Sequence, residues 1–502
     1  MLLTEIIKVL GPDIFISGDT ADIDIKGLAY DSRKVASEFI FVAIPGMQVD
    51  GHAFITHAAD KGAAAIIYEH DTDLPEGIPA IRVPDSRAAL AAAAALFYNY
   101  PDRRMRLIGV TGTNGKTTTT FLIKWLLEQA GHKTGLIGTI CNLAGDEELP
   151  ASHTTPESLE LFQLFSHMEQ KGCKYIAMEV SSHALSQGRV SSCNFAGAVF
   201  TNLTQDHLDY HGTMESYLQS KVRLFRQLDM EAGHNRYGVI NINDHSSSSF
   251  AENCNAPVWT YGSNEESTLR LLHHTPTPNG TKFAVTYFGE MHVGFIPLLG
   301  KFNVYNALAA MAVALAEGIE MEAILESMKS APQVPGRFEL IDEGQDFSVV
   351  VDYAHTPDGL KNILSAATKL EPRRLISVFG CGGNRDKGKR PIMGRIAGAQ
   401  SDVAIITSDN PRFEDPLDII EQVEIGIKQV CNNYLVEENR ERAVRLAINM
   451  AEAGDIVVVA GKGHETYQII GDVKYHCDDR ETARMVLKER MGKNKATKIK
   501  VN

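Results

Sequence analysis

A glycine loop between an apolar strand and a helix most constrains the fold of this chain. The loop, Gly112-Thr-Asn-Gly-Lys-Thr-Thr118, follows the apolar run 106–111 and precedes the helical run 121–130. In such a turn the backbone N–H groups stay free and meet the N-terminus of a helix, where phosphate binds. We therefore predict an α/β domain in which Lys116 reaches the β- and γ-phosphates of a nucleotide and Thr117 binds Mg²⁺.

The loop departs from a strict Walker A motif, because Val110 occupies the position of the first glycine in that pattern. A strand-to-helix turn that binds no ligand therefore remains an alternative for this segment. A phosphate loop also leaves the reaction undefined, since many unrelated activities use one. The type of reaction has to be inferred from residues elsewhere in the chain.

The length and the interruptions of the sequence predict three domains. A chain of 502 residues exceeds the size at which a single hydrophobic core stops growing. The polar segment 101–104 and the Pro/Gly-rich segment 332–337 interrupt an alternation of strand-like and helical runs. We predict an α/β protein with a small N-terminal α/β domain (1–103), a central P-loop-type ATPase domain with a mostly parallel sheet (104–333) and a Rossmann-like C-terminal domain (334–502).

The composition excludes several classes of function. A formal net charge of −14 would repel a phosphate backbone, so we expect no nucleic-acid partner. The longest apolar run, 88–98, is about half of the roughly 20 residues that a membrane span needs, and the N-terminus lacks the features of a secretion signal. The seven cysteines are scattered and never form a C-x-x-C pair, which is typical of reduced thiols. We predict a cytoplasmic protein without membrane insertion, disulfides or a zinc site.

Two further apolar runs end in polar residues that suit ligand binding. Glu179, Ser182 and His183 follow one run, at the strand end where α/β proteins bind ligands. Glu179 offers the hard oxygen that Mg²⁺ prefers. The next run is followed by a second polar cluster, Asp206, His207, Asp209 and His211. For any single histidine of this cluster, a structural hydrogen-bonding role is the alternative.

Taken together, these segments resemble the Mur ligases, and the resemblance runs through all three predicted domains in the expected order. In the N-terminal domain, 31–34, 41–44 and 50–54 are similar to the uridine-nucleotide module of the tripeptide-forming branch of that family. This similarity implies that Ser32 contacts UDP. The folylpolyglutamate synthases share the later domains but not this module, so the resemblance argues against them.

In the central domain the resemblance implies where the UDP-linked substrate and the metal bind. Besides Ser32 of the N-terminal domain, the residues implied for UDP-N-acetylmuramoyl-dipeptide are Thr154, Thr155, Ser182, Gln187 and Arg189. Lys221 matches the lysine that the family carbamylates, and the resulting anion would bind Mg²⁺ together with Thr117, Glu179 and His207. Without the resemblance, Lys221 would be interpreted as a solvated helix lysine. The implied catalytic residues are Lys116, Glu179, His207 and Lys221.

The resemblance further implies an ATP site between the central and C-terminal domains, which would close over ATP and exclude water. Its implied residues are Gly112, Thr113, Asn114, Gly115, Lys116, Thr117, Thr118, Asn303, Arg337 and Asp352, and Asn306 and His355 match neighbouring family positions. Three residues depart from the family's usual pattern and bear on substrate affinity rather than on the type of reaction: Gln205, Ser220 and Asn384.

The segment Asp409-Asn-Pro-Arg412 resembles the family's signature for meso-diaminopimelate. Arg412 and Arg385 would bind carboxylate groups through charge-assisted hydrogen bonds, and Glu465 would pair with the distal ammonium. The full set implied for the amino acid is Arg385, Asp409, Asn410, Pro411, Arg412, Gly461 and Glu465. A turn opened by Asn-Pro with a surface arginine is the alternative.

The resemblance thus implies an ATP-dependent, amide-forming ligase of peptidoglycan-precursor synthesis. ATP would phosphorylate the glutamate γ-carboxylate of UDP-N-acetylmuramoyl-L-alanyl-D-glutamate, and the amine of meso-diaminopimelate would attack the acyl phosphate, releasing ADP and phosphate. Mg²⁺ is the expected cofactor, ATP is a substrate, and a monomer is expected. The alternatives are a lysine-adding relative, a folylpolyglutamate synthase-like ligase and a catalytically silent nucleotide-binding module.

Overall fold

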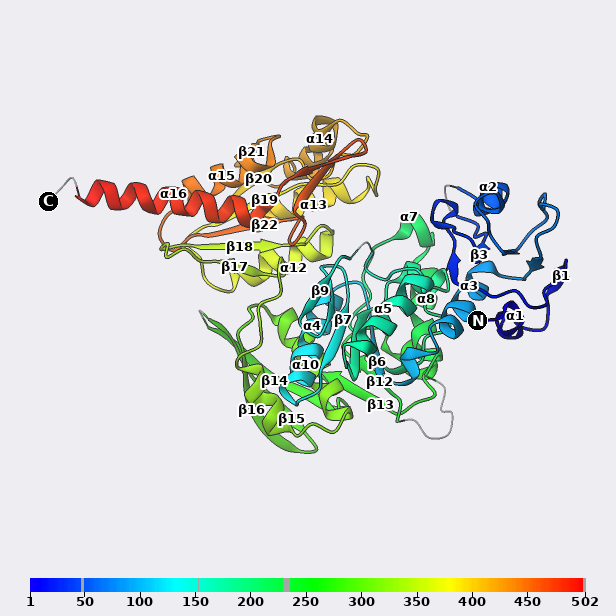
Figure 1. Cartoon of the computed structure of the whole chain (residues 1–502). Coiled ribbons are helices and arrows are strands. Elements are labelled where there is room, and N and C mark those ends of the chain that lie inside the picture. The colour runs from blue at the N-terminus through cyan, green and yellow to red at the C-terminus, as the bar shows by residue number, and fades with distance from the viewer. Residues whose placement is uncertain (47–48, 152, 229–234, 278, 500–502) are drawn as a thin grey trace.

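The computed structural model describes residues 1–46, 49–151, 153–228, 235–277 and 279–499, with side chains described as far as 491. Three separate α/β units follow one another along the chain. In Figure 1 the central unit lies between the N-terminal unit at the right and the C-terminal unit at the upper left. No helix in the described part of the chain combines the length and the apolar character that crossing a membrane requires.

The N-terminal unit is a five-stranded sheet in the order β1-β5-β4-β3-β2, parallel except for β1. Its strands are β1 Phe15–Ser17, β2 Gly27–Ala29, β3 Phe39–Val42, β4 Ala65–Tyr68 and β5 Ala80–Arg82, and its α-helices are α1 Leu3–Val9, α2 Ile55–Asp60 and α3 Ser86–Phe97. Helix α3 begins where the Asp85 carboxylate accepts hydrogen bonds from the N–H groups of Arg87 and Ala88. The buried alanines of α3 then allow close packing against the sheet and against α5 of the next unit.

The central unit contains an eleven-stranded sheet in the order β16-β15-β14-β13-β12-β11-β6-β10-β7-β8-β9. Its strands are β6 Arg106–Thr111, β7 Thr134–Ile137, β8 Asn142–Ala144, β9 Glu147–Leu149, β10 Tyr175–Glu179, β11 Phe195–Phe200, β12 Tyr237–Asn241, β13 Val258–Gly262, β14 Leu269–Thr277, β15 Gly280–Tyr287 and β16 Glu290–Ile296. The neighbouring strands β7, β10, β6, β11, β12, β13 and β14 pair in parallel. Antiparallel strands extend the sheet at both edges, β8 and β9 beyond β7 and β15 and β16 beyond β14. Strands β6, β10 and β11 are almost wholly buried, as expected for parallel strands covered on both faces.

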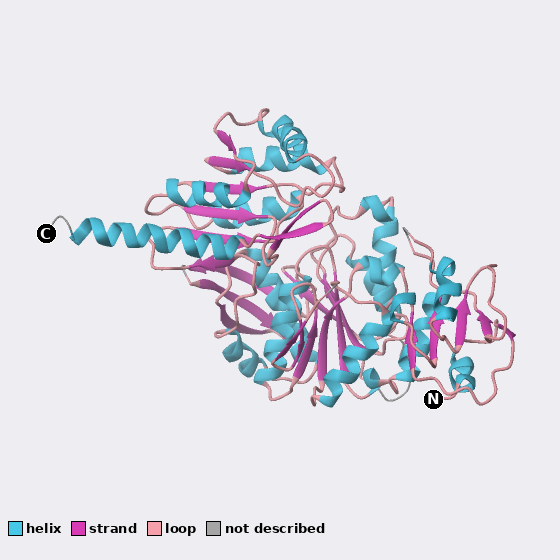
Figure 2. Cartoon of the chain, turned by 45° about the horizontal axis from the view of Figure 1, so that its top comes forward, coloured by secondary structure: helices cyan, strands magenta, loops and turns pink. Residues whose placement is uncertain are grey.

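Helices cover both faces of this central sheet (Figure 2). They are α4 Lys116–Gln129, α5 Ser158–Gln170, α6 Ser182–Ser186, α7 Leu208–His211, α8 Met214–Arg226, α9 Ser247–Glu252, α10 Lys301–Ala316 and α11 Met321–Met328. From Ala307 onward, helix α10 is apolar on all sides and is correspondingly buried, and the helix packs against α4 and β12 to β14. Its N-terminus thereby lies beside the glycine loop that begins α4.

The C-terminal unit is a six-stranded sheet in the order β17-β18-β22-β19-β20-β21, parallel except for β17. The strands are β17 Glu339–Ile341, β18 Ser348–Asp352, β19 Leu375–Phe379, β20 Val403–Ile406, β21 Tyr434–Val436 and β22 Ile456–Ala460, with a hairpin of β23 Tyr467–Ile470 and β24 Val473–His476. The helices are α12 Pro357–Thr368, α13 Lys389–Gln400, α14 Pro416–Ile427, α15 Arg440–Met450 and α16 Asp479–Ile499, the last of which projects away from the body (Figure 1).

The predicted fold class, α/β with a mostly parallel central sheet and a Rossmann-like third unit, is confirmed. The expected boundary at 103/104 falls between α3 and β6, and the boundary at 333/334 falls between α11 and β17. We keep these boundaries as a proposal. Parallel strands place their carboxyl ends at one edge of a sheet, so the residues that follow β6, β10 and β11 are brought together there.

Candidate active site

The glycine loop adopts a conformation that only glycine accommodates at two positions. Gly112 has φ +147° and Gly115, at the start of α4, has φ +86°. A side chain at Gly112 would collide with the Thr201 hydroxyl, and one at Gly115 would collide with the Asn306 amide. The loop therefore packs directly against β11's end and α10, which fixes its backbone N–H groups at the start of α4.

Two lysines meet at the carbonyl oxygen of Gly112. The Lys116 ammonium donates to the carbonyls of Gly112 and Thr113, each at 2.9 Å. The Lys221 ammonium, from α8, donates to the same Gly112 oxygen at 2.9 Å. Lys221 is only 1% exposed, so it is not the solvated helix lysine that the sequence alone would suggest. Burial and the neighbouring Lys116 hold the pKa of the Lys221 amine well below its ordinary value.

A low amine pKa matters for the chemistry of Lys221. Only the unprotonated amine reacts with CO₂ to form a carbamate, and lowering the pKa raises the fraction in that form. Burial also lowers the pKa of the Lys116 amine, with a further contribution from Arg337. Lys116 and, from the C-terminal unit, Arg337 thus place positive charge beside the loop, which suits a polyphosphate ligand.

The predicted metal-binding side chains lie next to the loop. The Thr117 hydroxyl donates to Glu179 Oε2 at 3.0 Å, and the other oxygen of Glu179 accepts the Thr139 N–H at 2.8 Å. Burial lowers the pKa of His207 to about 4, so its imidazole is neutral at neutral pH and has a lone pair for a metal. A hydroxyl, a carboxylate and, after carbamylation of Lys221, a second carboxylate-like group form an oxygen-rich set that fits Mg²⁺.

A cavity of about 450 Å³ separates the central and C-terminal units at this point. Its walls include the loop residues 113–118 together with Glu179 and His207, all from the central unit. The C-terminal unit contributes Arg337, Asp352 and His355. The structure therefore brings most of the predicted ATP and metal residues of both units around one cavity, although Gly112, Lys221 and Asn303 do not line it.

Direct contacts across this cavity join the two units. Arg337 Nη2 donates to the Thr117 hydroxyl at 3.0 Å. The Asn114 amide donates to the Asp358 carboxylate, in the first turn of α12, at 3.0 Å. Burial raises the pKa of Asp358 above its ordinary range. Asp358 was not singled out from the sequence, although an acidic residue in the first helical turn after a strand was the available signal.

Two residues predicted for ATP, Asn303 and Asp352, form hydrogen bonds that hold neighbouring parts of the site in place. Asn303 is buried, and its Oδ1 accepts a hydrogen bond from Asn306 Nδ2 at 3.1 Å. Asn306 is the one of the pair that lines the cavity and faces Gly115. Asp352 accepts the N–H groups of Phe338 and Ala354, each at 2.7 Å, which fixes the backbone on either side of Arg337 and β18.

Most of the residues predicted for the UDP-linked dipeptide form one polar group beside Glu179. The Thr155 hydroxyl donates to the Glu179 carbonyl at 2.9 Å, and Thr154 contacts Thr139 at 3.0 Å. Arg189 donates to the Thr155 carbonyl at 2.9 Å and to the Gln187 amide oxygen at 2.6 Å.

The two remaining dipeptide residues are held by histidines in different units. His211 lies 3.0 Å from the Ser182 hydroxyl, beside the polar group in the central unit. Ser32 lies apart, in the N-terminal unit, where His57 contacts its hydroxyl at 3.0 Å. The predicted set therefore spans two units, as a long substrate with a nucleotide at one end requires.

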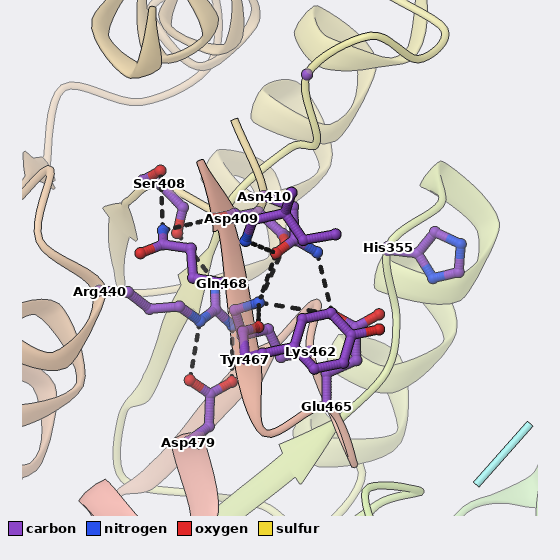
Figure 3. A network of polar contacts seen from close by, with 12 residues as sticks. His355, Ser408, Asp409, Asn410, Arg440, Lys462, Glu465, Tyr467, Gln468 and Asp479 are labelled. Atoms are coloured by element: carbon purple, nitrogen blue, oxygen red, sulfur yellow. Dashed lines mark hydrogen bonds and ion pairs between the residues drawn. The ribbon is translucent and has the colours of Figure 1, made fainter. Parts of the chain in front are cut away.

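Most of the residues predicted for the amino acid follow β20 and β22, and Figure 3 shows Asp409, Asn410 and Glu465 among them. Arg385 is exposed and lies after β19. Arg412 has φ +54° and donates to the Gly383 carbonyl at 2.8 Å, and Asn410 donates to Glu465 at 3.0 Å. Burial lowers the pKa of Arg412, and the nearby Arg385 lowers it further. Two guanidinium groups that repel one another form a natural site for a carboxylate.

Comparisons with known proteins agree with this geometry. Three family models match consecutive segments: "Mur ligase family, catalytic domain" over 24–107, "Mur ligase middle domain" over 110–314 and "Mur ligase, glutamate ligase domain" over 336–463. The chain belongs to the Mur ligase family. The resemblance of the motifs to that family is thereby confirmed.

This Mur ligase is similar to curated relatives along nearly all of its length. It is 48% identical over 470 residues to the UDP-N-acetylmuramoyl-L-alanyl-D-glutamate--2,6-diaminopimelate ligase of Geobacillus kaustophilus (strain HTA426), covering 93% of this chain and 96% of the relative. It is 46% identical to the protein of the same name from Solibacter usitatus (strain Ellin6076), covering 97% of this chain and 98% of that protein.

This chain is also similar in fold to solved structures. A solved UDP-N-acetylmuramoyl-L-alanyl-D-glutamate--2,6-diaminopimelate ligase, 32% identical, superimposes with a TM-score of 0.69 and covers 98% of this chain and 99% of its own. A folylpolyglutamate synthase from Mycobacterium tuberculosis, 17% identical, has a TM-score of 0.62, covers 75% of this chain and 93% of its own, and shares the fold.

Proposed function

We propose that this Mur ligase joins meso-diaminopimelate to UDP-N-acetylmuramoyl-L-alanyl-D-glutamate in an ATP-dependent reaction that forms an amide and releases ADP and phosphate. The observation that carries the proposal is the pair Arg412 and Arg385 beside Glu465, which supplies two cations for carboxylates and one anion for an ammonium. The names of the relatives that match almost the whole chain support it. Because ATP is the substrate, we place the reaction in the cytoplasm.

Phosphoryl transfer relies on charge placed before the reaction begins. Lys116 and the N–H groups at the start of α4 neutralise the β- and γ-phosphates, so the γ-phosphoryl group can pass to the glutamate γ-carboxylate. Arg337 belongs to the C-terminal unit, and its Nη2 lies 3.0 Å from the Thr117 hydroxyl. It therefore adds a cation from the side of the cavity opposite the central unit. The protein holds ATP and the glutamate γ-carboxylate next to one another, and no side chain forms a covalent intermediate.

Mg²⁺ would be held by Thr117, Glu179, His207 and carbamylated Lys221. When bound, this ion supplies charge neutralisation for the triphosphate. Neutral His207 offers a lone pair without needing to lose a proton first, and the buried Glu179 side chain supplies oxygen atoms. Lys221, which now donates to Gly112, would turn from a cation into an anion on carbamylation. That change removes the repulsion between Lys221 and Lys116.

The acyl phosphate is attacked by the amine of the incoming amino acid. Glu465, held by Asn410, binds the distal ammonium, while Arg412 and Arg385 bind carboxylates, so the reacting nitrogen at the other end is fixed relative to the acyl group. Contacts between the two units, such as Asn114 with Asp358, keep water from the acyl phosphate.

A lysine-adding enzyme and a folylpolyglutamate synthase-like ligase remain the competing functions. Lysine lacks the second carboxylate, and its use would leave the half-buried Arg412 guanidinium without a carboxylate partner, a loss that typically reduces kcat/KM by about 10⁴-fold in sites built for a polar group. We would measure phosphate release with ATP and UDP-N-acetylmuramoyl-L-alanyl-D-glutamate, supplying meso-diaminopimelate or lysine, and with a folate plus glutamate. Turnover with diaminopimelate alone is expected. Equal turnover with lysine, or activity on folate, would reject the proposal.

A further inference from the structure

Lys462 is a buried cation at the base of the two loops that carry the predicted amino-acid residues (Figure 3). It follows β22, and its side chain is 0% exposed. Its ammonium donates to Asn410 Oδ1 at 3.0 Å and to the backbone carbonyl of Tyr467. It also lies 3.5 Å from Glu465 Oε2. A charge without access to water is stable only when it is paired and hydrogen-bonded in this way.

The ammonium determines which way the Asn410 amide faces. An ammonium donates only, so the Asn410 atom next to it has to be the oxygen, which also accepts the Ile469 N–H at 3.0 Å. The NH₂ group of Asn410 is thereby turned toward Glu465 and donates to Oε2 at 3.0 Å. Lys462 and Asn410 therefore hold the same oxygen of Glu465. Within the described part of the chain, Glu465 Oε1 forms no hydrogen bond and is the oxygen left for a ligand.

Electrostatics give Lys462 a second effect on Glu465. Burial raises the pKa of Glu465, and the neighbouring Asp409 raises it further. Lys462 acts in the opposite direction, because a cation next to a carboxyl group favours its charged form. The titratable groups that face Glu465 are Asp409 and Arg412 after β20, Tyr353 after β18, and Lys462 and Tyr467 on its own loop and hairpin. Among the residues that the structure describes, Lys462 is the cation in direct contact with the Glu465 carboxylate.

We propose that Lys462 is a positioning residue, which orients the Glu465 carboxylate and keeps it charged for the ammonium of the incoming amino acid without touching that amino acid. The inference rests on the proposed function, in which Glu465 receives the distal ammonium of meso-diaminopimelate. Arg440 stabilises the loop that carries Lys462. Its guanidinium pairs with Asp479 at 2.8 Å and donates to the Ala460 carbonyl at 3.0 Å, which holds the start of the loop that carries Lys462.

The first test is steady-state kinetics of the full-length Lys462→Met variant. Methionine keeps the length of the side chain and removes its charge and donors. The KM for diaminopimelate should rise about 10-fold, while the KM values for ATP and UDP-N-acetylmuramoyl-L-alanyl-D-glutamate stay within about twofold. Lys474→Met is the matched control, because Lys474 is exposed and stacks on the ring of Tyr467, 4.3 Å from its centre, whereas Lys462 contacts the backbone carbonyl of that residue. A parallel rise in all three KM values would overturn the inference.

The pH profile separates positioning from general support of the fold. Binding of the ammonium requires ionised Glu465, and loss of Lys462 raises the pKa of that carboxyl group. The acidic limb of 1/KM for diaminopimelate should therefore move to higher pH by about one unit in Lys462→Met. An unmoved limb would overturn the inference. If Lys462→Met does not fold, Lys462→Gln retains an N–H donor beside Asn410 and lacks the charge, and the same shift is expected.

A double-mutant cycle with Glu465→Gln tests whether Lys462 acts through Glu465. In the Glu465→Gln background, Lys462→Met should change the KM for diaminopimelate by less than about twofold. Multiplying effects would show that the two residues act independently, which would overturn the inference. If Glu465→Gln alone left this KM unchanged, the proposed amino-acid site would itself be wrong. If Glu465→Gln raised it and Lys462→Met did not, only the role of Lys462 would fail.

Discussion

The ammonium groups of Lys116 and Lys221 donate to one and the same acceptor, the carbonyl oxygen of Gly112, each at 2.9 Å. The two residues are far apart in the sequence, and they reach the loop from α4 and α8. Burial is the main cause of the low pKa of Lys221, and the neighbouring Lys116 cation lowers that pKa further. Conversion of one of them to an anion would turn repulsion into attraction.

Replacing Lys116 with alanine should lower kcat by about 10²-fold or more, because the cation that stabilises the transferring phosphoryl group is lost. Phosphate release measured with all three substrates at saturation tests this expectation. Lys329→Ala is the control, since Lys329 is an exposed lysine of the same unit that pairs with Glu326 on α11. Near wild-type turnover in Lys116→Ala would refute the assignment of the phosphate loop.

Replacing Lys221 with alanine should abolish most turnover, and added acetate or propionate should restore part of it. The small carboxylate would occupy the space of the lost carbamate and supply its negative charge. Labelling with ¹³C-bicarbonate provides an independent measurement, since a carbamate carbon signal should be present in the wild type and absent from Lys221→Ala. A wild-type enzyme without this signal, or a variant with unchanged rate, would contradict the carbamate.

Replacing Arg412 with alanine should lower kcat/KM for meso-diaminopimelate by about 10- to 100-fold, because a charge-assisted hydrogen bond to a carboxylate is lost. The selectivity over lysine should fall with it, since lysine gains nothing from the arginine. Competition assays with both amino acids measure this ratio directly. Arg395→Ala, an exposed arginine on α13, should leave the ratio unchanged. An unaltered ratio in Arg412→Ala would show that another residue selects the amino acid.

Replacing Asp479 with alanine should destabilise the C-terminal unit by roughly 3–5 kcal/mol, because Arg440 would be left as a buried charge without its partner. Both side chains of this pair are 1% exposed. The pair Arg445 and Glu489 joins the same two helices at the surface, so Glu489→Ala should cost less than about 1 kcal/mol. Thermal unfolding of the two variants side by side tests the difference, and equal midpoints would show that burial of the first pair has no energetic effect.

Features written in local sequence could be predicted well. The glycine loop, the strand before it and the helix after it are contiguous, so their pattern alone indicates a phosphate site. The polar residues after β10 and β11 were also predictable, since parallel strands place their carboxyl ends together. The antiparallel hairpins that extend the central sheet were not predicted, because edge strands have weaker patterns than buried parallel ones.

Features that depend on packing between distant segments could not be predicted without the family resemblance. Lys221 is buried because α8 packs behind the glycine loop, and no sequence pattern within α8 predicts that burial. Asn303 and Asn306 have the same chemistry in the sequence, and only the direction of α10 decides which of them lines the cavity. The role of Lys462 was not predicted for the same reason, since its hydrogen-bond partner Asn410 lies 52 positions away in the sequence.

The contacts of Arg337 with Thr117 and of Asn114 with Asp358 place the two halves of the ATP site on different units. Nucleotide affinity and the relative position of the units are then thermodynamically linked, and any ligand that favours one favours the other by the same factor. Part of the interaction with ATP is used to close the molecule rather than to lower the dissociation constant. A compound that bridges the phosphate loop and α12 while holding them apart would therefore inhibit without resembling any of the three substrates.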